Sequence, residues 1–248
     1  MHTLSIGKVK MSYVDSHDLA AIIEVIVMDI YGIRYLKKGD VVLDLGGGIG
    51  EFALLSSKAV GESGLVVSVE PNTDDFKLMT KNLAENDCKN VRSFNRAFSS
   101  KTCEVSLVFK GHKFQAETIS VEELITCLAD SKKRKFDIIK MDIEGAEKEA
   151  VELLKEYLNG VRSIMIELHG TKEDVDKILE PLGFKFRRLT KSDYIKKSLA
   201  FLIRHPITTL NILRLFNSSG ENPGFKKILG GIEITASQEL MVGRYERL

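Results

Sequence analysis

Two segments that combine acidic residues with glycines carry most of the residues that could do chemistry. The first is the run Asp44-Leu45-Gly46-Gly47-Gly48-Ile49-Gly50. Glycine accepts positive φ and lets a ligand lie against bare backbone, so this run predicts a ligand-binding turn. It lacks the Gly-Lys-Ser/Thr ending of a phosphate-binding loop, and Glu51 takes the third glycine position of a dinucleotide motif, where it would repel a pyrophosphate. A nucleoside with a positive centre and no phosphate fits better, and S-adenosylmethionine is such a ligand.

Glu70 strengthens this prediction. It ends the next apolar run, at the position where a carboxylate can accept both hydroxyls of a ribose. Taken alone, the glycine run could be an ordinary turn between a strand and a helix. The glycine spacing and Glu70 together favour a cofactor site.

The second segment is Lys140-Met141-Asp142-Ile143-Glu144-Gly145-Ala146-Glu147. Asp142 and Glu144 could orient an acceptor, accept its proton or hold a divalent cation, or they could simply favour the start of the next helix. His169 ends a later apolar run and is a candidate base because the pKa of histidine is near neutral; a packed or solvated histidine is the alternative. We predict Asp142 first, His169 second and Glu144 third as catalytic residues, and no resident metal.

The elements that must position these residues alternate along the chain. Short aliphatic runs begin near Val41, Leu65, Ile138 and Ile164, and a helical pattern follows each of them. Such alternation predicts a doubly wound, Rossmann-like α/β fold with a mostly parallel sheet. Ligands of such sheets bind outside the carboxyl ends of the strands, where both segments lie.

Other segments interrupt or flank this alternation. We expect a strand over 91–98, a hairpin formed by 104–109 and 114–119, and a last strand over 239–247. Residues 1–39 form an N-terminal extension with a short strand or hairpin at 4–14 and then a helix. Residues 192–216 predict two amphipathic helices broken at His205-Pro206. The whole chain, 1–248, is predicted to be one domain, with 191–230 as a helical, lid-like insertion before the last strand.

The 248 residues are 44% hydrophobic and 29% charged, which excludes disordered and collagen-like proteins. The formal net charge is +1, but the chain from Lys185 onward has 12 Lys/Arg against 5 Asp/Glu, whereas residues 1–184 have 24 against 30. The basic C-terminal region could face an anionic or membrane-surface partner, or be a solvated face. Three cysteines without zinc or disulfide spacing, and no signal peptide or long apolar run, predict a cytoplasmic protein.

The quoted segments resemble the FkbM-type methyltransferases. The resemblance covers about 39–170 and rests on the glycine run, Glu70-Pro71-Asn72, the segment 118–124 and, most specifically, Ile139-Lys140-Met141-Asp142-Ile143-Glu144-Gly145-Ala146-Glu147. It implies the class I methyltransferase fold, a seven-stranded sheet with an antiparallel last strand. It also implies methylation of a hydroxyl by S-adenosyl-L-methionine. The family usually has Asp-x-Gly-Ala-Asn at the first loop, where this chain has Asp44-Leu45-Gly46-Gly47-Gly48.

The resemblance also implies a cofactor site by position. Asp44, Gly46, Gly48 and Gly50 would surround the methionine part and Glu70 would hold the ribose, while Asn72 and Ala97 would flank the adenine. Our main interpretation is an O-methyltransferase for a hydroxyl of a small molecule or glycan. The alternatives are a methyltransferase for RNA or another nucleic acid, for which the sequence has no strong signal, and a non-catalytic protein that binds the cofactor. The sequence does not specify the acceptor or the oligomeric state.

Overall fold

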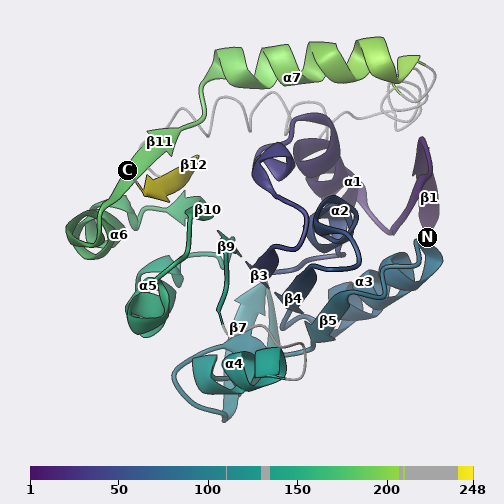
Figure 1. Cartoon of the computed structure of the whole chain (residues 1–248). Helices are drawn as coiled ribbons and strands as arrows, with labels where there is room; N and C mark the ends of the chain where they lie inside the picture. Colours follow the sequence, from purple (N-terminus) through teal and green to yellow (C-terminus); the bar gives the residue numbers. More distant parts are fainter. Residues whose placement is uncertain (110, 130–134, 207–208, 210–239, 248) are drawn as a thin grey trace.

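The computed structural model describes the chain except residues 110, 130–134, 207–208, 210–239 and 248. Its centre is a seven-stranded sheet, mostly parallel, with antiparallel β12 between β10 and β11 (Figure 1). This confirms the predicted fold, including the antiparallel last strand. In spatial order the strands are β5 (Val91–Phe94), β4 (Leu65–Val69), β3 (Val41–Leu45), β9 (Ile138–Met141), β10 (Ser163–His169), β12 (Leu240–Arg247) and β11 (Phe184–Arg188).

Both faces of the sheet are covered, as expected when every residue of the central strands is apolar or buried. Along β3, Val42 packs into one core and Leu43 into the other, because successive side chains of a strand point to opposite faces. The first core includes residues of α1 (Ser16–Ile22), α2 (Glu51–Val60), α3 (Thr73–Glu85) and α7 (Lys191–Arg204). The second includes residues of α4 (Val121–Ala129), α5 (Glu147–Leu154) and α6 (Lys172–Leu179).

Short helical turns extend several of these helices. The π-helical turn η1 (Ile23–Val27) continues α1. The 3₁₀ turn η2 (Ile33–Tyr35) precedes β3, and η3 (Lys155–Tyr157) and η4 (Glu180–Leu182) follow α5 and α6.

The N-terminal extension packs into the same core as the sheet. The predicted strand or hairpin is a hairpin of β1 (His2–Ile6) and β2 (Val9–Tyr13), and α1 follows it. Two asparagines, Asn82 in α3 and Asn86 at its end, form hydrogen bonds with the backbone of β2. Ser12 N donates to Asn82 Oδ1 at 2.7 Å, and Lys10 N donates to Asn86 Oδ1 at 3.0 Å. The extension therefore packs against the sheet and α3.

The strand predicted over 91–98 is wrong in one respect, since it is two strands in two sheets. The chain leaves the central sheet at Asn95, whose side-chain amide donates to Glu70 O at 3.0 Å and Pro71 O at 3.1 Å. The short β6 (Ala97–Phe98) then pairs with β8 (His112–Ile119) of a second sheet. The predicted hairpin is confirmed as β7 (Glu104–Phe109) and β8.

The first of the two helices predicted over 192–216 is α7, which ends at His205 before Pro206. Lys197 Nζ donates to Asp29 O at 2.7 Å, so Lys197 is turned toward the N-terminal extension. The rest of the predicted insertion lies outside the described residues, apart from a few positions near 206 and 209. A lid role for 191–230 stays a prediction. Within the described ranges, no helix is both long and apolar enough to cross a membrane.

Candidate active site

A cavity of about 340 Å³ opens at the carboxyl edge of the sheet, the expected place for a ligand in an open α/β fold. The turns after β3, β4 and β9 form its floor, and α1 and the β7–β8 hairpin contribute its walls. Its described lining includes six carboxylates and no Lys or Arg. Those carboxylates belong to Asp18, Glu51, Glu70, Asp75, Asp142 and Glu144.

The glycine turn lies between the ends of β4 and β9. Gly46 N and Gly47 N both donate to Val69 O at 3.0 Å. Gly46 has φ +77°, and a Cβ there would lie 1.7 Å from the backbone oxygen of Asp142, so only glycine fits. Gly46 and Gly48 line the cavity.

Gly50 is not among the residues that line the described cavity, and its predicted place around the methionine part of the cofactor stays a prediction. It caps α2 with φ +89°, and a Cβ there would lie 2.7 Å from Met79 Cγ. Its role in this structure is to let the turn pack against α3.

Glu70 stands where the sequence predicts, at the end of β4 and in the cavity lining. Its carboxylate accepts from Gly48 N at 2.8 Å and from Asn72 N at 2.7 Å. Burial raises the pKa of Glu70 to about 7, although these backbone bonds work to lower it. Asn72 and Ala97 also line the cavity, but the Asn72 side chain caps α3 by accepting from Asp74 N and Asp75 N. The Oδ1 atom of Asn72 is therefore engaged at the start of α3.

Asp44 lies behind the cavity and not in its described lining, and its predicted place around the methionine part of the cofactor stays a prediction. The side chain is completely buried and accepts from Ser68 Oγ at 2.7 Å. Lys140 Nζ lies 3.3 Å from Asp44 Oδ1 and donates to Gly46 O. Burial lowers the pKa of Lys140, but the charge of Asp44 and its other acidic neighbours raises it on balance. The pair thus holds the glycine turn from beneath.

Asp142 faces the cavity and is held by a residue from the N-terminal extension. Tyr31 Oη donates to Asp142 Oδ2 at 2.8 Å and lies 3.1 Å from Glu167 Oε2. Burial, with the charges of Asp142 and Glu24, raises the pKa of Glu167 to about 8. Helix capping does not explain Asp142, because the N-cap of α5 is Ala146, with no side-chain capping bond.

His169 lies beside this group, bound to a buried glutamate. Its Nδ1 is 3.0 Å from Glu147 Oε1, and its Nε2 is 3.5 Å from Glu144 Oε2. Burial lowers the pKa of His169, but the Glu147 hydrogen bond and the charge of Asp142 outweigh burial and raise it to about 9. At neutral pH His169 is therefore a charged donor, and it can act as a base only after losing a proton.

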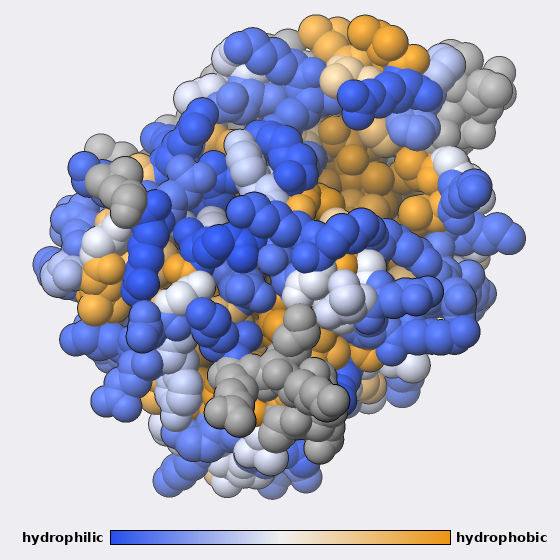
Figure 2. Space-filling model, viewed as in Figure 1, coloured by the Kyte–Doolittle hydropathy of each residue, from blue (hydrophilic) through white to orange (hydrophobic). Residues whose placement is uncertain are grey.

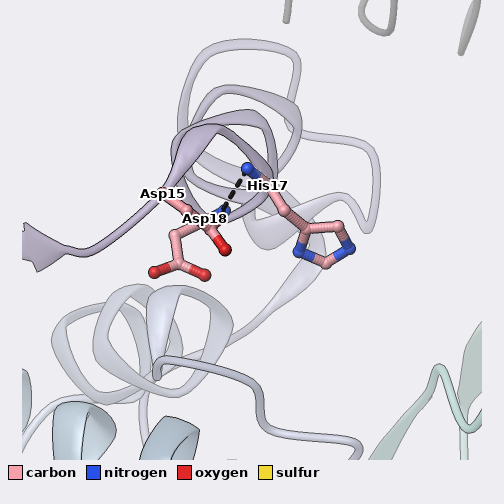
Figure 3. Close-up of side chains that lie close together, drawn as sticks. All are labelled: Asp15, His17 and Asp18. Carbon is pink, nitrogen blue, oxygen red and sulfur yellow. Dashed lines mark hydrogen bonds between the residues drawn. The ribbon is translucent and has the colours of Figure 1, made fainter. Parts of the chain in front are cut away.

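Among the described residues, two groups of side chains could hold a metal ion, because their ligand atoms lie within 4.8 Å of one another: Asp142, Glu144 and His169, and Asp15, His17 and Asp18. The second group gathers at the first turn of α1 (Figure 3). There Asp15 caps the helix, accepting from His17 N at 2.8 Å and Asp18 N at 2.9 Å. Asp18 accepts from Val14 N at 2.8 Å. These bonds account for both carboxylates as parts of the helix start.

The hairpin gives the cavity an apolar wall. Leu107, Phe109 and Phe114 line it, and the His17 ring meets the Phe109 ring edge-on, with centroids 5.9 Å apart. The wall and α1 thus close the cavity from two sides.

Sequence reasoning missed four residues of this site. Lys140 had a visible signal, since a lysine inside a fully buried strand requires a partner. The sequence singled out Glu51 only because its charge would repel a pyrophosphate, and it gave Glu147 only as part of the quoted segment. Tyr31 had no signal in the sequence, because its hydrogen bonds join it to residues more than a hundred positions away.

Known proteins resemble this chain in sequence. Residues 44–189, more than half of the chain, match the family model described as the methyltransferase FkbM domain. The chain is 28% identical over 157 residues to the hexuronic acid methyltransferase AglP of Haloferax volcanii. That match covers 58% of this chain and 62% of the relative's own length.

Solved structures resemble the chain at a lower level. They include precorrin-6y C5,15-methyltransferase from Geobacter metallireducens GS-15, with TM-score 0.45, 13% identity, and coverage of 65% of this chain and 71% of that chain. An O-methyltransferase from Thermotoga maritima has TM-score 0.43 and 18% identity, with coverage of 71% and 53%. On the family match, this chain belongs to the FkbM methyltransferase domain family.

Proposed function

We propose that the protein transfers a methyl group from S-adenosyl-L-methionine to a hydroxyl of a small molecule or glycan. The observation that carries the proposal is that one cavity joins the glycine turn and Glu70 to Asp142 and Glu144. A cofactor bound at the glycine turn and Glu70 would therefore lie in the same cavity as an acceptor bound at Asp142 and Glu144. The AglP relative, named for its action on a hexuronic acid, supports a glycan as one acceptor class.

The lining fits this cofactor. Glu70 is buried and offers carboxylate oxygens to a ribose diol, while Gly48 presents bare backbone beside it. Glu51 adds a buried carboxylate oxygen, Oε2, that has no hydrogen-bond partner in the described structure and could face a positive group. A pyrophosphate would meet these carboxylates with no Lys or Arg among the described lining residues. The donor set therefore suits a cationic nucleoside.

When bound, this cofactor supplies an electrophilic methyl group. Asp142 would accept the hydroxyl proton or orient the hydroxyl, and Tyr31 would hold its carboxylate in place. Glu144 and the charged His169 lie beside it and would position the acceptor. The apolar wall of the hairpin would keep water away from the reacting groups.

The same charges favour a neutral hydroxyl over a carboxylate or a nucleic acid as the acceptor group. Asp142 and Glu144 line this side of the cavity, and an anionic acceptor group placed beside them would be repelled. A polyanion also needs basic residues near the cavity, and the described lining has none.

Two experiments test the proposal. Calorimetry should detect S-adenosylmethionine and S-adenosylhomocysteine binding and no affinity for NAD or ATP. Isotope-labelled S-adenosylmethionine, incubated with fractionated cell extract, should then label an oxygen of a small molecule or glycan, identified by mass spectrometry. Binding without any transfer would favour the non-catalytic alternative, and label in RNA would favour the nucleic-acid one. Affinity for NAD alone would reject a methyl-donor site.

A further inference from the structure

We infer that Glu51 is the recognition point for the α-amino group of the cofactor's methionyl part, and that it selects nucleosides carrying this amine. The inference rests on the proposed function, since it assumes that the cavity binds S-adenosylmethionine. Glu51 is the first residue of α2, is only 7% exposed and lines the cavity. A buried carboxylate aimed at a cavity calls for a cationic or hydrogen-bond-donating ligand group.

The protein itself leaves one oxygen of this carboxylate unsatisfied. Glu51 Oε2 has no hydrogen-bond partner among the described residues. The nearby cation, Lys140, is engaged elsewhere, with Gly46 O and Asp44. Asp44 and Asp142 both act electrostatically on Glu51 as further negative charges. The single positive charge of Lys140 is therefore shared among the carboxylates of Asp44, Glu51 and Asp142. The end of the cavity near Glu51 consequently attracts a cation.

The position of Glu51 relative to Glu70 indicates which part of a ligand it would meet. A Cβ placed on Gly48 would lie 3.4 Å from Glu51 Oε1 and 3.5 Å from Oε2. Gly48 N also donates to Glu70 Oε2 at 2.8 Å. Both carboxylates thus lie beside Gly48, each near a different atom of it. A ligand with a diol at one end and an ammonium group at the other matches this pair, and an adenosyl amino acid has both.

The titration of Glu51 supports the same assignment. Burial raises the pKa of Glu51 to about 8, although the charge of Lys140 on β9 works to lower it. The carboxylates of Asp44 on β3 and of Asp142 after β9 add to the rise, and Asp18 of α1 lines the same cavity. Near neutral pH the free protein therefore holds a proton on Glu51. An ammonium group at this position would displace that proton.

The test compares two variants with two ligands by calorimetry. S-Adenosylhomocysteine carries the amino acid part, and 5′-methylthioadenosine has the same nucleoside without it. We expect Glu51→Gln to weaken S-adenosylhomocysteine binding by roughly tenfold or more and to leave methylthioadenosine binding nearly unchanged. Glu70→Gln, the matched control, should weaken both ligands. Binding of S-adenosylhomocysteine to the wild type should also release a proton, seen as a buffer-dependent heat that Glu51→Gln abolishes.

The outcomes separate this inference from the proposed function. If the wild type binds neither nucleoside, the proposed function fails. If it binds both and Glu51→Gln keeps full affinity for S-adenosylhomocysteine, or loses both ligands equally, the role of Glu51 is refuted. If Glu51→Gln does not fold, a measurement on the wild-type protein still tests the inference. The wild type should bind the analogue of S-adenosylhomocysteine that lacks only the α-amino group at least about tenfold more weakly than S-adenosylhomocysteine itself, and equal affinity would overturn the inference.

Discussion

Asp142 is the residue on which the proposed reaction depends most. It faces the cavity, accepts a hydrogen bond from Tyr31 and does not cap α5. We expect Asp142→Asn to lower kcat by roughly 10²-fold or more while the melting temperature holds, because asparagine can still accept from Tyr31. Turnover of labelled S-adenosylmethionine, with the acceptor found in extract, measures this effect.

A control and a chelator complete the Asp142 experiment. Glu149→Gln, on the exposed side of α5, should leave turnover unchanged. Unchanged kcat in Asp142→Asn would remove Asp142 from the chemistry. Activity lost in EDTA and restored by Mg²⁺ would instead make Asp142, Glu144 and His169 ligands of a cation.

Lys140 is a charge at the centre of the sheet, with 2% of its side chain exposed. Removing it leaves Asp44, with no exposed surface, as an uncompensated buried carboxylate. We expect Lys140→Met to lower the free energy of unfolding by about 3–5 kcal/mol, and a second change, Asp44→Asn, to recover part of the loss. Denaturant unfolding gives both values.

The surface pair of Lys148 and Asp174 is the comparison for Lys140. Its charged atoms lie 3.8 Å apart and both side chains are about half exposed. Lys148→Met should cost less than about 1 kcal/mol. An equally small cost for Lys140→Met would mean that the buried pair does not support the glycine turn.

The buried carboxyls also predict how stability depends on pH. Burial raises the pKa of Glu51 and Glu167 to about 8 and of Glu70 to about 7, above the ordinary value of 4.5, and the pKa of His169 rises from 6.5 to about 9. Between the unfolded and folded pKa values the folded protein binds more protons than the unfolded chain, so stability falls as pH rises. We expect the melting temperature to decrease from about pH 5 to about pH 9, with Glu51→Gln flattening the slope.

Thermal melts in a series of buffers without ligand measure this slope. Glu62→Gln, on the exposed turn before β4, should leave the slope as it is in the wild type. A protein that becomes more stable between pH 6 and 9 would show that these groups titrate close to their ordinary values.

At the scale of elements, the glycine turn works because it is pressed against the end of β9. Gly46 and Gly183 have similar positive φ values, +77° and +84°, but only Gly46 has a close neighbour, the Asp142 oxygen at 1.7 Å from an added Cβ. We expect Gly183→Ala to cost about 1–2 kcal/mol from backbone strain alone. Gly46→Ala should cost more than about 3 kcal/mol and abolish cofactor binding.

The difference between the two alanine variants isolates the close approach of β3 and β9. Denaturant unfolding and calorimetry with S-adenosylhomocysteine measure it. Equal costs for the two variants, with binding retained in Gly46→Ala, would mean that the turn can move away from β9 without consequence for the site.

At the scale of the whole molecule, the acidic cavity and the exposed apolar side chains of α7 lie in different places. The acidic cavity faces one edge of the sheet, while α7 exposes Leu199, Leu202 and Ile203. Figure 2 shows apolar surface at the top of the molecule, where α7 lies in Figure 1. Lys196 and Arg204 are exposed on the same helix. We expect this surface to bind vesicles that contain anionic lipid, because basic and aliphatic side chains together suit a lipid interface.

The double variant Lys196→Gln/Arg204→Gln should reduce vesicle binding in a flotation assay and leave cofactor binding intact, since no described residue of α7 lines the cavity. Lys77→Gln/Lys89→Gln makes the same charge change at exposed positions elsewhere and should have little effect. Lys197 is left out because it is bonded to the N-terminal extension. A wild-type protein that does not float, or a double variant that floats equally well, would contradict a lipid-facing α7.

Local patterns in the sequence determined the fold. The aliphatic runs that begin near Val41 and Leu65 are the strands Val41–Leu45 and Leu65–Val69, and the helix Glu51–Val60 follows the first of them as predicted. These elements follow from periodicity and from glycines at their ends, which are properties of neighbouring residues. For the same reason Glu70, Asp142 and the glycines could be placed at the carboxyl edge of the sheet from sequence alone.

Only the tertiary structure decided which polar side chains have partners. Asp44 could not be recognised as a buried partner of Lys140, nor Tyr31 as the residue that holds Asp142, because these contacts join distant segments. The break of the third strand at Asn95 likewise depends on bonds to the turn after Glu70. Sequence periodicity reports which face of an element is apolar, whereas the pairing of buried charges depends on how the faces meet in three dimensions.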